Sequence, residues 1–147
     1  MVEIDCLSGE VVDAAVRIHR DLGPGLQESV YEMVLAGSLA RRGLKVDRQR
    51  PIDIVFEGVR YESAFRIDLL VEDELLVEIK SVERLAPVHG KQLLTYLRLT
   101  KQPVGLLLNF SGATMKEGIK RVVNDYRPRQ DSSASPRLRV NQSNGEF

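Results

Sequence analysis

Two neighbouring segments decide the fold: Phe65-Arg-Ile-Asp-Leu-Leu-Val71 and Leu75-Leu-Val-Glu-Ile-Lys80. Both consist largely of β-branched and large apolar residues, and an acidic turn, Glu72-Asp73-Glu74, separates them. This pattern predicts two antiparallel strands joined by a hairpin turn. A turn centred on its middle residue puts Asp68 directly opposite Glu78, and it puts Arg66 opposite Lys80.

The predicted hairpin gathers charged side chains on one face. Directly opposed residues of an antiparallel pair share a face, with Cβ atoms ~4.5–5.5 Å apart, so Asp68 and Glu78 are close enough to hold one cation. Lys80 follows Glu78 by two residues and points to the same face. The opposite face is expected to be the core side and is wholly apolar, with Phe65, Ile67, Leu69, Val71, Leu75, Val77 and Ile79.

Two acids and a lysine on one face suit phosphodiester hydrolysis. The reaction needs a cation that polarises the phosphoryl group and lowers the pKa of an attacking water, and carboxylate oxygens hold such a cation. A lysine orients that water or neutralises developing negative charge. The alternative is a surface charge network across two strands, an arrangement that contributes little energy.

The rest of the chain predicts an α/β fold. A helix capped by Ser8, with buried positions such as Val11 and Val16, is followed by a second helix from about Pro24 to Gly43. Strands occupy Lys45 to Lys80, a third helix runs from Pro87 to about Leu99, and Val104–Phe110 reads as a strand covered on both faces. The order is ααβββαβα, with helices on both sides of the sheet. The last helix is expected to use Met115, Ile119, Val122, Val123 and Tyr126.

Composition limits the class of protein. A chain of 147 residues that is 43% hydrophobic suffices for one core, so we expect one domain over 1–126 and a flexible tail over 127–147. A single cysteine, Cys6, and two histidines exclude a multi-cysteine zinc site and favour a hard ion such as Mg²⁺ or Mn²⁺. The acidic start and the lack of a long apolar run predict a cytoplasmic protein without a membrane span.

Positive charge is local. The formal net charge is zero, which gives no general support for nucleic-acid binding. Residues 41–50 nevertheless hold five basic side chains against one acid, Asp47. They form either a basic ridge for a polyanion or a solvated helix end and loop.

At this point the residues resemble a known family. Gly25-Leu-Gln-Glu-Ser-Val-Tyr31 fits the signature of the GxxExxY proteins, and the two strand segments look like that family's second block. The resemblance covers about 8–126. That family is grouped with the PD-(D/E)XK nuclease superfamily, which implies a restriction-endonuclease-like core with a mixed sheet flanked by helices.

Carried over by position, the resemblance makes Asp68 and Glu78 metal ligands and Lys80 the catalytic lysine. The backbone carbonyl of Ile79 is a further candidate ligand. Ile67 stands where the superfamily's motif has proline. In this superfamily a glutamate from the preceding helix often reaches the metal, which nominates Glu28; the alternative is a first-turn glutamate favoured by the helix dipole.

Other side chains are candidates for secondary roles. In this superfamily the helix after the lysine strand commonly presents a polar residue to the scissile phosphate or the lysine, which nominates Gln92. Tyr96 either stacks on a base or bonds a buried backbone group. Tyr31 is a candidate nucleic-acid contact or a packed aromatic. Lys91 and Arg84 are candidate nucleic-acid contacts. His89 is expected to have a structural or surface role, and His19 is expected to lie at the edge of the core instead of acting as a ligand.

These observations predict a metal-dependent nuclease that acts on nucleic acid, with DNA as the expected substrate. One alternative is a non-catalytic nucleic-acid-binding module that retains the nuclease fold. Another is a protein-interaction domain that forms a homodimer through its helices. No Gly-rich phosphate loop follows a strand, which excludes a P-loop or dinucleotide site.

Overall fold

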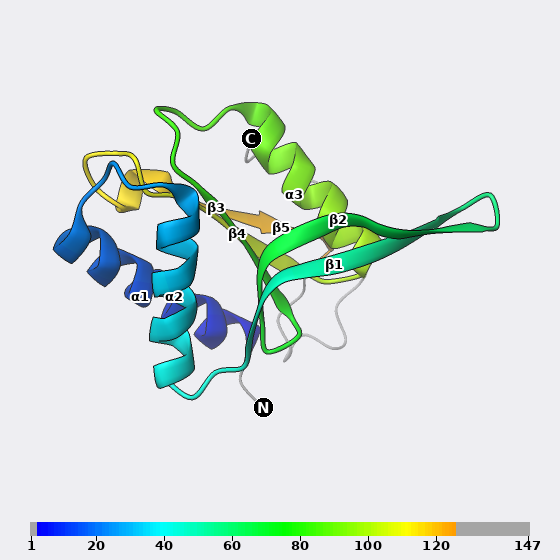
Figure 1. The fold of residues 1–147 in the computed structure, drawn as a ribbon, viewed down its shortest axis with the longest axis horizontal. Coiled ribbons are helices and arrows are strands. Elements are labelled where there is room, and N and C mark those ends of the chain that lie inside the picture. The colour runs from blue at the N-terminus through cyan, green and yellow to red at the C-terminus, as the bar shows by residue number, and fades with distance from the viewer. Residues whose placement is uncertain (1–2, 126–147) are drawn as a thin grey trace.

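The computed structural model describes residues 3–125 and shows a mixed α/β fold (Figure 1). The elements, in chain order, are α1 (Ile4–Leu22), α2 (Glu28–Arg41), β1 (Val46–Phe56), β2 (Val59–Val71), β3 (Leu75–Lys80), α3 (Pro87–Thr100), β4 (Val104–Asn109), the short 3₁₀ helix η1 (Lys116–Gly118) and β5 (Ile119–Val123). The fold class predicted from the sequence is therefore confirmed, although the last element differs.

The five strands lie in the order of the sequence, from β1 to β5. β3 pairs with β4 in parallel, and the other neighbouring strands pair in antiparallel fashion. Helix α3 makes the crossover between β3 and β4, as a parallel pair requires. The hairpin register matches the prediction, because Val71 pairs with Leu75 and Leu69 pairs with Val77.

Each face of the sheet carries its own core. Helices α1 and α2 cover one face, where Leu69, Val77 and Ile79 are buried with residues of these helices (Figure 1). Helix α3 covers the other face, where Leu93 and Leu97 are buried with a second set of strand residues. The inner strands are therefore apolar on both sides, and β4 is buried throughout.

One prediction about the hairpin faces is wrong. Phe65 and Ile67 do not lie on the same face as Leu69, because they pack in the α3 core together with Leu70. The alternation changes beside Gln49, which has a positive φ of 53° and interrupts the pairing of β1 with β2 opposite Asp68. Twisted strands redirect their side chains at such irregularities.

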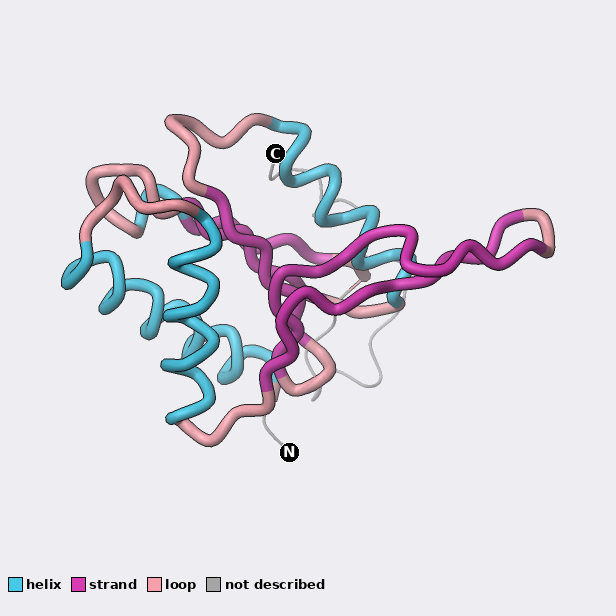
Figure 2. The backbone as a smooth tube through the Cα atoms, viewed as in Figure 1, coloured by secondary structure: helices cyan, strands magenta, loops and turns pink. Residues whose placement is uncertain are grey.

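Strands β1 and β2 extend beyond the body as a two-stranded arm (Figure 2). Pro51 lies within β1 rather than ending it, which an edge strand permits because one side of it has no hydrogen-bonding partner strand. Phe56 and Tyr61 near the tip are 62% and 49% exposed. Closer to the body of the sheet, Ile52 and Phe65 pair with each other and pack against the core under α3. Gln49 and Asp68 therefore lie in the part of β1 and β2 that belongs to the body, before the arm.

The expected last helix is wrong. Residues Ile119–Val123 form β5, which pairs with β4, after the 3₁₀ turn η1. β-branched residues suit an edge strand, and Gly118 lies so close to the carbonyl oxygen of Asn109 that any side chain would clash with it. Tyr126 and the tail 127–147 lie outside the described residues.

The two N-terminal helices differ from the prediction in their starts and their buried faces. Helix α1 begins before Ser8, whose hydroxyl donates to the Asp5 carbonyl within the helix instead of capping it. Val16 was expected to be buried but is exposed, and Met33 on α2 is exposed as well. Helix α2 begins at Glu28 and packs inward through Tyr31, Glu32, Leu35, Ala36 and Leu39.

Candidate functional site

Asp68 and Glu78 lie where β2 separates from β3. Backbone pairing of these strands ends at Leu69 and Val77. Beyond that pair, side chains replace the backbone ladder: the Asp68 N–H donates to Oε2 of Glu78 at 3.1 Å, and the Ile79 N–H donates to Oδ2 of Asp68 at 2.9 Å. The two carboxylates are therefore next to each other, as the predicted register requires.

The two carboxylates share a desolvated environment. Glu78 is only 6% exposed, and burial raises its pKa to about 8, with the neighbouring Asp68 carboxylate adding to the shift. Burial also raises the pKa of Asp68, in opposition to the hydrogen bond from Ile79. Within residues 3–125, neither acid forms an ion pair. Such a pair gains from a bound cation, because the cation offsets both the lost hydration and the mutual repulsion.

Lys80 is the positive charge associated with this acid pair. It ends β3 half-buried, and its charge lowers the pKa of both Asp68 and Glu78, although the larger effect of burial outweighs this. It makes no direct ion pair with them within residues 3–125. Lys80 is therefore near the acids without neutralising them, a position that leaves its ammonium group available to a bound anion.

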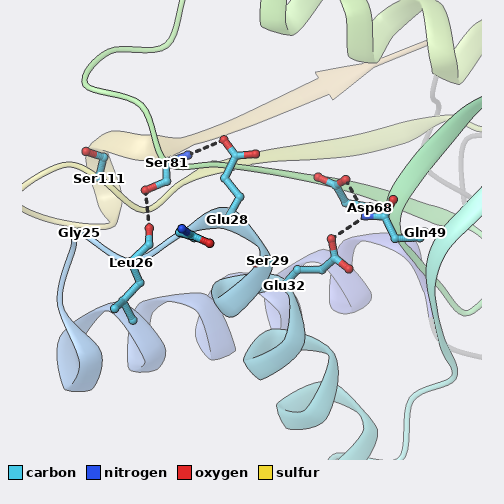
Figure 3. A pocket seen from close by; sticks show the side chains of 10 residues that line it. Gly25, Leu26, Glu28, Ser29, Glu32, Gln49, Asp68, Ser81 and Ser111 are labelled. Carbon is cyan, nitrogen blue, oxygen red and sulfur yellow. Dashed lines mark hydrogen bonds between the residues drawn. The ribbon is translucent and has the colours of Figure 1, made fainter.

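A pocket of about 690 Å³ opens beside Asp68 (Figure 3). Helix α2 and the loop before it form one side, and the ends of strands form the other. The pocket is lined by Gly25, Leu26, Gln27, Glu28, Ser29, Glu32, Gln49, Asp68, Ser81 and Ser111. Three of these side chains, Glu28, Glu32 and Asp68, are carboxylates. The pocket therefore suits a cation, or a ligand that brings a bound cation with it.

Glu28 lines this pocket as the first residue of α2, and its Oε2 accepts a 3.1 Å hydrogen bond from the Ser81 N–H. Ser81 directly follows Lys80, and its hydroxyl donates to the Leu26 carbonyl at 2.9 Å. Glu28 therefore ties the start of α2 to the end of β3. Glu28 was predicted to lie near Asp68 and Glu78, and its hydrogen bond to the Ser81 N–H, three residues after Glu78, is consistent with that position.

Tyr31 is structural, and the expectation that it contacts nucleic acid is wrong. Its side chain is fully buried and stacks on Phe110, with ring centroids 4.3 Å apart. Its hydroxyl donates to the Gly23 carbonyl at 2.5 Å and accepts from the Leu26 N–H at 3.2 Å. Tyr31 thus fixes the loop in which Gly25 adopts a positive φ of 103° and from which Glu28 starts.

Two site residues, Glu32 and Gln49, were not predicted. Glu32 is 6% exposed and accepts from Arg48 Nε at 3.1 Å. The amide of Gln49 donates to Glu32 Oε1 at 2.7 Å and to Asp68 Oδ1 at 3.2 Å (Figure 3). The spacing of Glu28 and Glu32, four residues apart on one helix, was the available signal for Glu32. Nothing in the sequence indicated Gln49.

The acid pair fits a hard divalent ion. Carboxylate oxygens are the ligands that Mg²⁺ and Mn²⁺ prefer, and the adjacent carboxylates of Asp68 and Glu78 lack an ion-pair partner. Among residues 3–125, however, no three His, Cys, Asp or Glu side chains come close enough together to hold a metal. The predicted metal ligands were Asp68, Glu78, Glu28 and the Ile79 carbonyl. Their three acids do not converge on one point in the described part of the chain. For Ile79, the contact with Asp68 is made by its N–H.

The predicted secondary residues lie in different places. Tyr96 stacks on Phe65, with ring centroids 4.1 Å apart. Burial raises the pKa of Tyr96, and the nearby charge of Glu78 adds to this shift. Gln92 and Lys91 are exposed on α3. Arg84 lines a separate pocket with Glu117 and Asn109, so it is not part of the Asp68 pocket.

The basic cluster at 41–50 is largely neutralised. Four of its five basic side chains form ion pairs: Arg42 with Glu10 and Asp13, Lys45 with Asp73, Arg48 with Glu32, and Arg50 with Asp47. The solvated, structural interpretation of this cluster is therefore favoured over a basic ridge.

The histidines are structural, as expected. His19 is buried with its Nε2 2.9 Å from the Gly112 carbonyl oxygen. His89 accepts the Ala86 N–H at 2.9 Å at the start of α3. Cys6 is a free, exposed thiol.

The fold and site define a restriction-endonuclease-like α/β protein. The family model of the PD-(D/E)XK nuclease superfamily matches residues 5–122, and the chain belongs to this superfamily. Its members are generally nucleases that use divalent metals. Within residues 3–125, no helix has both the length and the apolar character to cross a bilayer.

Similarity to individual proteins is weaker. No curated protein sequence matches the chain. Among solved structures it resembles the one titled "Crystal structure of SSO0001", with a TM-score of 0.42 and 18% identity over 87% of this chain and 77% of that chain. A likeness this distant carries no functional argument.

Proposed function

We propose that this protein is a metal-dependent nuclease that hydrolyses phosphodiester bonds in DNA. The observation that carries this proposal is the adjacency of Asp68 and Glu78 at the point where β2 separates from β3, with Lys80 near both. Within the superfamily, we assign the chain to the GxxExxY proteins on the basis of the motif from Gly25 to Tyr31. Mg²⁺ or Mn²⁺ is the proposed ion.

Each residue has a distinct proposed role. Asp68 and Glu78 bind the ion, which when bound polarises the phosphoryl group and lowers the pKa of a water. Lys80 holds the scissile phosphate by charge and stabilises the negative charge that develops there. Glu28 positions the backbone that follows Lys80 by accepting the Ser81 N–H. It also adds a third negative charge to the pocket beside Asp68.

Substrate binding does not rest on the cluster at 41–50, because its charges are already paired. Lys91 and Gln92, which are exposed on the helix that also carries Tyr96, remain proposed contacts. The ring of Tyr96 already stacks on Phe65 through one face, which leaves stacking on a base to its other face.

The test is a cleavage screen with the full chain, in Mg²⁺ or Mn²⁺, on labelled single-stranded, double-stranded and branched DNA and on RNA. We expect metal-dependent cleavage that EDTA abolishes, and a loss of about 10²–10³-fold in Lys80→Ala. Lys101→Ala, an exposed lysine at the far end of α3, is the matched control. Binding of DNA without cleavage by the wild type would favour the non-catalytic module. Cleavage of RNA alone would overturn the DNA assignment, and equal rates in wild type and Lys80→Ala would overturn the nuclease.

A further inference from the structure

The backbone at Gln49 is strained in the middle of a strand. Gln49 has a φ of 53°, the left-handed region that side chains other than glycine rarely adopt. Its neighbours Arg48 and Arg50 pair regularly with Leu69 and Ile67 on β2, but Gln49 itself has no partner in the ladder. Strain of this kind costs on the order of 1–3 kcal/mol and persists when surrounding contacts favour it.

The contacts that accompany the strain are two hydrogen bonds from one amide group. Nε2 of Gln49 donates to Glu32 Oε1 at 2.7 Å and to Asp68 Oδ1 at 3.2 Å (Figure 3). Hydrogen bonds to carboxylates are roughly twice as strong as those between neutral groups. A single nitrogen therefore lies between two acids that come from different elements, α2 and β2.

This nitrogen occupies the space between two carboxylates that a shared ion would need to occupy. Two metal–oxygen bonds of ~2.0–2.1 Å to a Mg²⁺ bring oxygens closer together than two N–H···O hydrogen bonds do. The amide of Gln49 therefore holds the Glu32 and Asp68 oxygens at a hydrogen-bond spacing, which is wider than the spacing of two ligands of one ion. This agrees with the absence of a three-acid cluster among residues 3–125.

We propose that Gln49 is a positioning residue whose amide occupies, in the metal-free protein, the place of a cation between Glu32 and Asp68. Glu32 becomes the third carboxylate of the site when the amide moves away. This inference rests on the proposed function, because it concerns the same ion site. It adds one ligand and one displaceable group that the motif residues do not include.

The surroundings of Glu32 suit this role. Its other oxygen accepts from Arg48 Nε at 3.1 Å, so one ion pair remains when the amide leaves. It is buried at 6% exposure and lies near enough to the acid pair to raise the pKa of both Asp68 and Glu78. Glu32 lines the same pocket as Asp68 and Glu28.

The test is calorimetric titration of the full chain with Mn²⁺, together with the Mn²⁺-induced rise in melting temperature. We expect Gln49→Ala to bind Mn²⁺ about tenfold more tightly than the wild type, which corresponds to about 1.4 kcal/mol, because no amide has to be displaced. Gln49→Gly should behave alike and fold well, since glycine accepts a positive φ. Gln102→Ala is the matched control, because the Gln102 amide donates to the Asp73 carbonyl instead of to the site.

Adding Glu32→Gln to Gln49→Ala should remove the gain in affinity. Unchanged or weaker Mn²⁺ binding by the folded Gln49→Ala or Gln49→Gly protein would overturn the inference, as would a gain that survives Glu32→Gln. Asp68→Asn separates the two proposals. Suppose that the wild type binds Mn²⁺, that Asp68→Asn does not, and that the Gln49 variants bind it as tightly as the wild type. Then only the proposed role of Gln49 fails. If wild type and Asp68→Asn bind alike, the proposed ion site itself fails.

Discussion

The Ile79 N–H donates a 2.9 Å hydrogen bond to the Asp68 carboxylate, at the position where a strand ladder would normally continue through backbone carbonyls. In the other direction, the Asp68 N–H donates to the Glu78 carboxylate at 3.1 Å, so here too a side-chain oxygen takes the place of a backbone carbonyl. The same acids that form the candidate ion site therefore also satisfy the backbone of the two separating strands. Changes to them should affect stability and metal binding separately.

The first prediction distinguishes these two roles of Asp68. Asp68→Asn keeps one oxygen that accepts the Ile79 N–H, but it loses the charge and the second oxygen, which accepts from Gln49. It should therefore be within about 1 kcal/mol of the wild type in EDTA and lose metal binding. Asp68→Ala leaves a buried N–H without its partner, which should cost about 1–3 kcal/mol. Urea unfolding in EDTA measures both variants. Equal stability of the Ala and Asn variants would contradict this role.

The second prediction concerns pH. Burial raises the pKa of Glu78 from its ordinary value of 4.5 to about 8, and it also raises the pKa of Asp68. The folded state therefore holds more protons than the unfolded state between these pKa values. In EDTA, Glu78 should not reduce the free energy of unfolding below about pH 4.5, where it is protonated in both states. As the pH rises from there towards 8, this group should lower the free energy of unfolding by at most about 1.4 kcal/mol per pH unit.

Urea unfolding at several pH values in EDTA checks this dependence. Glu78→Gln, which stays neutral, should flatten it, and saturating Mn²⁺ should reverse it, because the ion binds the deprotonated acids. Glu74→Gln, a half-buried glutamate of the hairpin turn outside the site, is the matched control. A wild-type stability that rises from pH 5 to pH 8 in EDTA would show that these acids are not protonated as described.

A third prediction concerns Tyr31. Tyr31→Phe keeps the stack on Phe110 but removes the hydroxyl bonds to the loop at Gly23 and Leu26. We expect a loss of about 1 kcal/mol in the free energy of unfolding. Hydrogen exchange at the Leu26 amide should become faster, because its acceptor is lost. Tyr61→Phe, on the exposed arm, should change neither quantity; an unchanged Leu26 exchange rate in Tyr31→Phe would argue against the proposed anchoring.

A fourth prediction concerns Glu28. Glu28→Gln keeps an acceptor for the Ser81 N–H, so the free energy of unfolding should stay within about 0.5 kcal/mol of the wild type. Loss of its negative charge from the pocket should lower metal-dependent cleavage about tenfold. Glu83→Gln, in the separate pocket, is the control. Full activity in Glu28→Gln would restrict Glu28 to a structural role.

The central hairpin was predictable because its geometry is local. A short acidic turn between two apolar runs sets the register, and period-two alternation then places Asp68 beside Glu78. The turn forms with Glu72 and Asp73 at positive φ, as tight hairpin turns require. The strand β4 was equally clear, because an uninterrupted apolar run indicates burial on both faces.

The errors arose where tertiary contacts override local pattern. Ile119, Val122 and Val123 have helical spacing but are β-branched, and pairing with β4 decides their conformation. Gln49 could not be predicted, because its role depends on a strained backbone and on two acids distant in sequence. In α2, apolar residues lie on more than one face, so spacing alone did not identify the buried one.

The most direct test of this account is crystallography of the protein soaked in Mn²⁺, with anomalous diffraction used to locate the ion. If Asp68 and Glu78 hold the ion, one strong anomalous peak should lie within coordination distance of a carboxylate oxygen of each, and Asp68→Asn crystals should show no such peak. A peak elsewhere, or no peak between these acids at saturating Mn²⁺, would contradict it.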